Sequence, residues 1–238
     1  MDNISISKIL RNQLSLLILV RHGKSLWNVE NRFTGWTDIS LSNDGIKEAE
    51  MAALEILDNK INIDNAYSSI FNRAIKTGEI ILNKSNHEFV KLEKDWRLNE
   101  RHYGDLQGLN KDETAAKFGK EKVFQWRRSF KTKPPLLEKK DQQKQLENPL
   151  FKNIPKSRIP LGESLEETVN RVKEFCNEIL FNKLEEEKNI LIAAHGNSIR
   201  ALIKIIKNKS EKETEKLEIQ TGKPIIFKYK NKVFTKFK

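Results

Sequence analysis

The sequence is short of the features that mark secreted, membrane or metal-dependent proteins. It has one cysteine, Cys176, in 238 residues, which excludes an internal disulfide and favours a reducing compartment. No apolar run approaches the roughly 20 residues that a membrane-spanning helix needs. It has only 4 histidines and no convincing cluster of metal ligands. We therefore expect a cytoplasmic protein that uses no metal and binds no membrane.

The N-terminal segment has a loose likeness to a signal peptide, because Lys8 and Arg11 precede the apolar run 14–20. That run is short, and an Arg-His-Gly sequence follows it where a small-residue cleavage site would stand. We interpret residues 1–13 as a polar lead-in and the apolar run as a buried strand.

The formal net charge is +11, from 44 Lys and Arg against 33 Asp and Glu. Such a balance suits nucleic acid, an anionic membrane surface or a small anionic substrate. No aromatic-basic RNA signature or zinc-finger spacing accompanies it, so no nucleic-acid partner is predicted. Much of the excess is interpreted as a solvated, Lys-rich surface.

The order of the predicted elements is typical of an α/β fold. Uninterrupted apolar runs predict buried strands at 14–20 and 189–194. The other predicted strands are shorter, and the last two form a hairpin around Asn231. The predicted strands cover residues 14–20, 66–69, 89–92, 189–194, 225–229 and 233–237. Helices are expected after Ser42 and over residues 73–82, 113–130, 164–179 and 199–206. This alternation predicts a three-layer sandwich, with a mainly parallel sheet flanked by helices.

Two helices carry clear start signals. Ser42 is a predicted N-cap, and Ser164 with Glu167 forms a capping box. The apolar face after Ser42 is expected to hold Ile46, Ala49, Ala53 and Leu57. Residues 131–162, rich in Lys, Gln and Pro, are interpreted as an exposed insertion within a single domain that covers residues 1–238.

Both buried strands run into a histidine and a glycine. Arg21-His22-Gly23 follows the first, and His195-Gly196-Asn197 follows the second. Ligands of open α/β sheets bind beyond the carboxyl ends of the strands, so His22 and His195 are candidate site residues. A third histidine, His87, lies in a polar loop and is expected to be exposed.

These residues suit phosphoryl transfer. A neutral imidazole at His22 can be the nucleophile if its other ring nitrogen is held by a partner. Arg21 and Arg73 can bind the phosphoryl oxygens through charge-assisted hydrogen bonds.

Four runs of residues then allow a comparison with a known family. They are RHGKSLWN at 21–28, FTGW at 33–36, NERHYG at 99–104 and AHGNS at 194–198. In this order they resemble the cofactor-dependent phosphoglycerate mutases of the histidine phosphatase superfamily, over about residues 16–229. The Arg-His-Gly motif marks the broad superfamily, whereas the run from Glu100 and the pair Arg127-Arg128 are narrower.

The resemblance implies a complete site. It implies that His22 becomes phosphohistidine, that Arg21, Arg73 and His195 surround the transferring group, and that Glu100 exchanges a proton with the substrate hydroxyl. The other substrate-binding positions that it implies are Ser25, Asn28, Thr34, Gly35, Tyr103, Lys111, Arg127, Arg128, Gly196 and Asn197.

The resemblance also implies a reaction, the glycolytic and gluconeogenic interconversion of 3-phosphoglycerate and 2-phosphoglycerate. The phosphoryl group of His22 would pass to the free hydroxyl, and 2,3-bisphosphoglycerate would be both the bound intermediate and the primer. No metal is implied, and relatives commonly form homodimers or homotetramers.

Two departures from the family affect the expected balance of mutase and hydrolase activity. Lys24 stands where an acidic or amide residue is usual, and is expected to add charge beside the phosphate pocket. The sequence also ends soon after its last predicted strand, so a less well covered site is expected.

Other readings of the same residues stay open. Water in place of a hydroxy acid would make the protein a phosphatase, and bisphosphoglycerate synthases and phosphatases share the same site residues. Glu100 and Arg101 could be a plain surface pair, and Arg127-Arg128 a solvated helix face. A non-catalytic binding protein is disfavoured, because His22, Glu100 and His195 are all present.

Overall fold

The computed structural model describes residues 14–237, so the predicted lead-in at 1–13 lies outside the described residues. Six strands form one sheet in the order β3-β2-β4-β1-β5-β6. Their bounds are β1 Ser15–Arg21, β2 Asn65–Ser68, β3 Leu92–Lys94, β4 Ile190–Ala194, β5 Pro224–Lys230 and β6 Val233–Lys236. The first four strands pair in parallel, and β5 and β6 are antiparallel to their neighbours.

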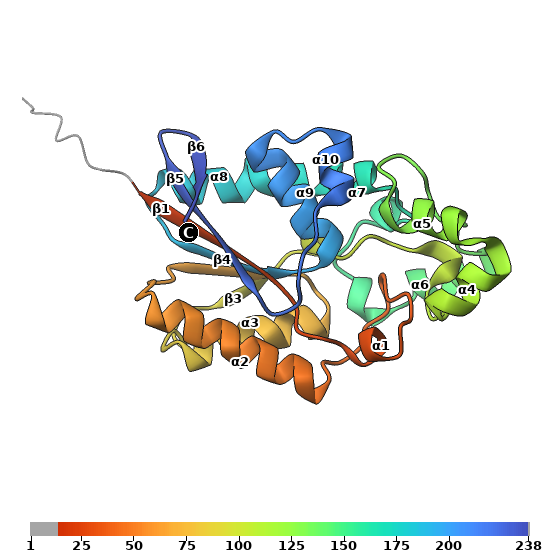
Figure 1. The fold of residues 1–238 in the computed structure, drawn as a ribbon, viewed down its shortest axis with the longest axis horizontal. Helices are drawn as coiled ribbons and strands as arrows, with labels where there is room; N and C mark the ends of the chain where they lie inside the picture. The colour runs from red at the N-terminus through yellow and green to blue at the C-terminus, as the bar shows by residue number, and fades with distance from the viewer. Residues whose placement is uncertain (1–13, 238) are drawn as a thin grey trace, which may run out of the picture.

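Helices cover both faces of this sheet, which confirms the predicted three-layer α/β sandwich. The helices α2 and α3 lie on one face, and α7, α8 and α9 lie on the other (Figure 1). The helices α4, α5 and α6 gather beyond one end of the sheet (Figure 1). The helix bounds are α1 Leu26–Val29, α2 Asn43–Asp58, α3 Asn72–Lys84, α4 Lys111–Phe118, α5 Lys120–Arg128, α6 Lys139–Leu146, α7 Leu165–Phe175, α8 Phe181–Glu185, α9 Gly196–Lys207 and α10 Glu211–Lys216. None of them is long and apolar enough to span a bilayer.

The central strand β1 is apolar on both faces because each face meets a separate cluster. Leu17 and Leu19 pack into the cluster shared with α7 and α9. Ile18 and Val20 pack into the cluster shared with α2 and α3. Alternation of side chains along the strand therefore fills both layers of the core, as the uninterrupted apolar run predicted.

Helix α2 begins as predicted, but its buried face differs. The Ser42 hydroxyl accepts from the Gly45 N–H at 3.1 Å, whereas Ile46 and Leu57 are 37% and 40% exposed. Ala49 and Ala53 are buried as predicted, and the residues buried with them are Gly45, Ala52 and Ile56. A Cβ at Gly23 would lie 2.0 Å from the Gly45 carbonyl oxygen, so the helix and the end of β1 touch through backbone. That close approach turns the small residues of α2 inward.

The strand predicted at 89–92 and the exposed position predicted for His87 are wrong. His87 is buried, its Nε2 accepts from the Ile63 N–H at 3.1 Å, and its Nδ1 lies 3.0 Å from the Ser85 hydroxyl. The turn around this ring delays the strand, so β3 begins only at Leu92.

The helical segments predicted over 113–130 are two helices, α4 and α5, separated at Gly119. That glycine has a positive φ of 88°, which other residues rarely adopt, and the first helix ends there. The Ser164 and Glu167 capping box of α7 is confirmed, and a π-helical turn over Cys176–Leu180 joins α7 to α8. The hairpin at Asn231 is also confirmed, by a turn with positive φ.

The segment 131–162 is mostly exposed but is attached to the domain at defined points. Phe151 packs against Trp36 and Phe71. The Gln145 side chain lies 2.7 Å from Nε2 of His102. The segment therefore lies against the part of the chain that carries Glu100.

Candidate active site

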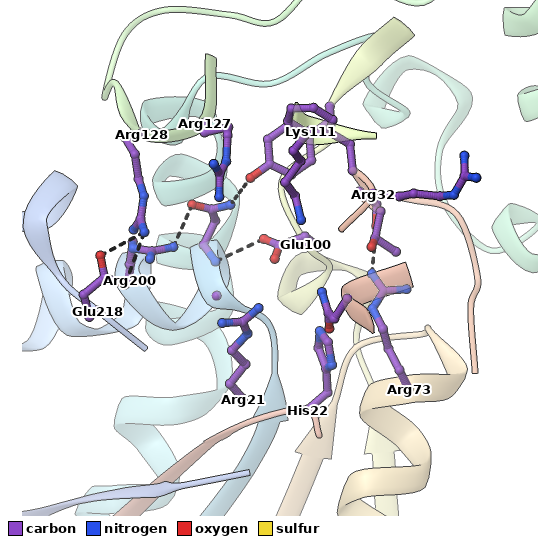
Figure 2. Close-up of a pocket in the computed structure, with 17 residues that line it drawn as sticks. Arg21, His22, Arg32, Arg73, Glu100, Lys111, Arg127, Arg128, Arg200 and Glu218 are labelled. Carbon is purple, nitrogen blue, oxygen red and sulfur yellow. Dashed lines mark hydrogen bonds and ion pairs between the residues drawn. The ribbon is translucent and has the colours of Figure 1, made fainter. Parts of the chain in front are cut away.

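A cavity opens at the carboxyl ends of β1 and β4. Seven cationic side chains and two carboxylates line it (Figure 2). Its lining residues are Arg21, His22, Asn28, Arg32, Phe33, Thr34, Gly35, Arg73, Glu100, Tyr103, Lys111, Arg127, Arg128, Gly196, Asn197, Arg200 and Glu218. The fold therefore brings together every predicted site residue except Ser25 and His195, in a cavity that suits a small anion.

His22 lies at the bottom of this cavity directly after β1. Its Nδ1 is 2.7 Å from the Gly23 carbonyl oxygen, which can only accept, so the ring hydrogen is on Nδ1. Burial, then Arg73 and Arg21, hold the pKa of His22 well below its ordinary value. The ring is therefore neutral at pH 7, and the lone pair on Nε2 is available as a nucleophile.

His195 lies beside His22, with ring centroids 5.0 Å apart. Its Nε2 is 2.7 Å from the Ser69 hydroxyl, which already accepts from the Phe71 N–H. Ser69 can thus donate its own hydrogen to Nε2, which leaves the ring hydrogen on Nδ1. This buried Nδ1 has no partner among the described residues. Burial is also the main cause of a pKa well below normal, so His195 is a neutral donor.

Arg21 and Arg73 are held by backbone carbonyls. Arg21 donates to Ile219 at 2.8 Å, and Arg73 donates to Thr37 and Gly35, both at 2.8 Å. The Nε atoms of both arginines are buried and have no partner within the described part of the chain. Burial lowers the pKa of Arg73 to about 10, which still leaves it charged at neutral pH. Two positive charges therefore remain for an anion to neutralise.

Glu100 is held at one carboxylate oxygen. Its Oε1 accepts the N–H groups of Arg101 at 2.8 Å and Asn197 at 3.0 Å. The side chain points into the cavity toward the space above His22 (Figure 2). Arg101 is fully buried and donates to the Glu163 carbonyl oxygen, so the alternative of a surface Glu100–Arg101 pair is wrong. Glu100 can thus exchange a proton with a bound ligand.

The far side of the cavity carries cations from the helices α4 and α5. Lys111 begins α4, and burial, then Arg127 and Arg21, lower its pKa to about 8. Arg128 pairs with Glu218 at 2.9 Å, and both line the cavity. The pair Arg127-Arg128 therefore faces the cavity and is not a plain solvated helix face.

Sequence reasoning missed Arg200, a buried residue of α9. It donates to Asn197 Oδ1 at 3.2 Å and to the Leu217 carbonyl oxygen at 2.8 Å. Burial and Arg128 lower its pKa to about 10. The available signal was its spacing, because a residue three positions after Asn197 lies on the same helix face. The missed Arg32 lines the cavity, but its guanidinium is directed away, to Glu30 (Figure 2).

Ser25 and Lys24 do not line the cavity. Ser25 caps α1, and its hydroxyl accepts from the Asn28 N–H at 3.2 Å, so it orients Asn28. The Lys24 ammonium lies 3.7 Å from Glu48 in a neighbouring hollow, where its charge is compensated. The charge expected beside the phosphate pocket is therefore directed outward.

Within residues 14–237 no group of three His, Cys, Asp or Glu side chains could hold a metal ion. Trp36 packs against Phe71 and Phe151.

The model of the Histidine phosphatase superfamily (branch 1) matches residues 17–145 and 136–236. The chain belongs to this superfamily and, within it, to the family of the 2,3-bisphosphoglycerate-dependent phosphoglycerate mutases. A mutase of that name from Borreliella burgdorferi strain ZS7 is 47% identical over 89% of this chain and 85% of its own length. Another from Staphylococcus epidermidis is 44% identical over 93% of this chain and 97% of its own length.

Solved structures share the fold at lower identity. A phosphoglycerate mutase from Bacillus anthracis has a TM-score of 0.66 and 23% identity, over 94% of this chain and 92% of that one. A mycobacterial glucosyl-3-phosphoglycerate phosphatase has a TM-score of 0.70 and 21% identity, over 94% and 98% of the two chains. At this identity the likeness concerns the fold alone.

Proposed function

We propose that the protein interconverts 3-phosphoglycerate and 2-phosphoglycerate through a phosphohistidine on His22. The observation that carries the proposal is the set of buried donors without partners around His22 among the described residues. They are Nε of Arg21, Nε of Arg73 and Nδ1 of His195. Unpaired buried donors are costly, and a phosphoryl group would supply acceptors for all three. The mutases that are 44% to 47% identical to the chain support the choice of substrate.

In the transfer step, the substrate hydroxyl oxygen bonds to phosphorus as the bond from phosphorus to His22 Nε2 breaks. The electron pair of that bond returns to Nε2, and the hydroxyl proton passes to the free oxygen of Glu100. Arg21, Arg73 and His195 stabilise the charge on the equatorial oxygens. The reverse transfer, onto Nε2, uses the same groups with the proton returned.

The remaining lining residues hold the ligand. Lys111, Arg127 and Arg128 bind the carboxylate and the phosphate that is not reacting, with Tyr103 beside them. The reacting end is held by Asn28, Thr34, Gly35, Gly196 and Asn197. When bound, 2,3-bisphosphoglycerate supplies the phosphoryl group that charges His22, and the cationic lining fits an anion of that charge.

The test is 3-phosphoglycerate turnover with and without added 2,3-bisphosphoglycerate, with released phosphate measured in the same reaction. Formation of 2-phosphoglycerate that depends on the primer, with little free phosphate, is the expected result. Release of phosphate as the main product would contradict the mutase and indicate a phosphatase. Accumulation of the bisphosphate would indicate a synthase.

We also propose that the chain acts as a single domain, in the cytoplasm, as a homodimer or homotetramer. The buried, unpaired Cys176 is consistent with a reducing compartment. Light scattering after size exclusion would give the mass of the assembly, and a monomer at micromolar concentration would contradict this part of the proposal.

A further inference from the structure

A buried ion pair lies outside the cavity, next to the Glu100 loop, residues 97–103. It joins Arg171 of α7 to Glu163, which comes just before that helix, and each residue is 4% exposed. The contact is bidentate, with Nε to Oε1 at 2.7 Å and Nη2 to Oε2 at 2.9 Å. Neither residue lines the cavity.

Arg171 gives its remaining donors to the backbone of this loop. Its Nη1 donates to the carbonyl oxygens of Arg97 at 2.7 Å and Asn99 at 2.9 Å, and its Nη2 donates to that of Glu100 at 2.9 Å. With the two bonds to Glu163, all five N–H donors of the guanidinium are used. No other side-chain type offers five donors in one plane.

Glu163 holds the other side of the same loop. Its Oε2 accepts from the His102 N–H at 2.8 Å, and its own N–H donates to the His102 carbonyl oxygen at 2.9 Å. Its carbonyl oxygen accepts from Arg101 Nε at 2.7 Å. The ion pair therefore fixes the backbone both before and after Glu100.

A buried ion pair is an expensive way to gain stability, because both charges lose water. The role of this ion pair is instead geometric, since it sets the position of the Glu100 carboxylate. Proton transfer requires the acceptor within hydrogen-bond reach of the reacting hydroxyl. A displacement of about 1 Å can cost on the order of 100-fold in rate.

We propose that Arg171, oriented by Glu163, is a positioning residue that aims the Glu100 carboxylate at the reacting hydroxyl. The inference rests on the proposed function, in which Glu100 exchanges the substrate proton. Arg171 touches no substrate atom and acts only through the Glu100 loop.

The test is Arg171→Lys, measured on two reactions that share His22 but differ in their need for a proton. In the mutase reaction the lysine, with three donors on one atom, cannot hold the loop, so kcat should fall by at least about 10-fold while KM changes little. With 4-nitrophenyl phosphate the leaving group departs as a stable anion. Its burst, which reports phosphorylation of His22, should stay within about 2-fold of the original rate. Equal losses in both reactions, or an unchanged kcat, would overturn the proposal.

A double variant separates action through Glu100 from a separate defect. Glu100→Gln should itself lose most mutase turnover, and adding Arg171→Lys to it should cause little further loss. Multiplied losses would contradict the proposal. If Glu100→Gln keeps full turnover, or the unmodified protein has no mutase activity, the proposed function fails instead.

Two further variants control for folding. Trp36→Phe removes the only other side-chain bond to the Glu100 carbonyl oxygen among the described residues, at 2.6 Å. It should show the same selective loss of kcat, which makes the test independent of whether Arg171→Lys folds. Arg158→Lys is the matched control, because Arg158 pairs with Glu174 of α7 at 2.8 Å without touching the Glu100 loop. It should leave both reactions unchanged.

Discussion

The floor and the rim of the cavity are built in opposite ways. The floor comprises Arg21, His22 and Arg73, with His195 packed beside His22, and the rim comprises Lys111, Arg127, Arg128 and Glu218. The floor arginines are tied to backbone carbonyls and form no ion pair among the described residues. At the rim, Arg128 already has a carboxylate partner, Glu218, whose side chain is 76% exposed.

This difference predicts that the floor carries out the phosphoryl transfer and that the rim sets the affinity for the ligand. Donors fixed by backbone need no reorganisation when charge develops on a phosphoryl group. Charges at this half-buried rim are partly screened by water and salt, and can be shared between a resident carboxylate and a ligand. Substitutions in the floor should therefore abolish the reaction, whereas substitutions in the rim should change binding and specificity.

The largest effect is expected from His22→Ala. Labelled 2,3-bisphosphoglycerate should leave an acid-labile label on the unmodified protein, because phosphoramidates hydrolyse in acid. The variant should lose the label and reduce turnover by at least about 1,000-fold, because the phosphoryl acceptor is removed. A metal chelator should leave the unmodified protein unchanged. Substantial turnover in the variant would show that His22 is not the phosphoryl acceptor.

Arg127→Ala tests whether the rim is specific for phosphoglycerates. Loss of one charge-assisted contact costs about 1.5–3 kcal/mol, or about 10- to 150-fold in kcat/KM for 3-phosphoglycerate. Phosphorylation of His22 by 4-nitrophenyl phosphate should be spared, because that small substrate does not reach Arg127. Equal losses on both substrates would make Arg127 a structural residue of α5.

The pH dependence distinguishes the rim from the floor without removing a side chain. The pKa of Lys111 is about 8, so its charge is present below that pH and is lost as the pH rises through it. The kcat/KM for 3-phosphoglycerate should fall by up to about 10-fold across this range, since one charged contact disappears. Lys111→Arg should keep its charge and remove the fall. A fall of the same size in the variant would assign the titration to another group.

The smallest effect is expected from Glu218→Gln. The carboxylate competes with ligand anions for Arg128, so its removal should lower KM for 3-phosphoglycerate by about 2- to 3-fold at low salt. The change should vanish at high ionic strength. Glu211→Gln, whose partner Lys131 does not line the cavity, is the control and should leave KM unchanged. An unchanged KM at low salt would mean that Glu218 does not share Arg128 with the ligand.

The floor could be predicted from sequence because its signals are local. His22 and His195 each follow an apolar run directly, and parallel strands bring their carboxyl ends together. The rim could be assigned only through resemblance, since nothing in its spacing places Arg127 near β1. Arg200 and Glu218 were missed because a charged residue in a helix or loop is usually a surface residue.

The errors in the fold have a common physical cause. Ile46 and Leu57 satisfy the helical period of α2, but backbone contact at Gly23 sets its rotation. The polar sequence around His87 predicts an exposed side chain, but its ring is buried because Nε2 accepts from the Ile63 N–H. No local pattern marks Arg171 either, although five acceptors surround it. The rotation of α2, the burial of His87 and the contacts of Arg171 each depend on residues distant in sequence, which local patterns do not record.

The position of β1 between β4 and β5 has a consequence for synthesis of the protein. The strand is translated long before β4 and β5, its two neighbours in the sheet. Such long-range pairing is slow, and an apolar strand without neighbours is prone to aggregation. Ribosomes that stall before β4 would thus release chains that already contain most of the site residues but expose an unpaired central strand. We expect chaperones to bind such chains at β1 and proteases to remove them, so that only completed translation yields active enzyme.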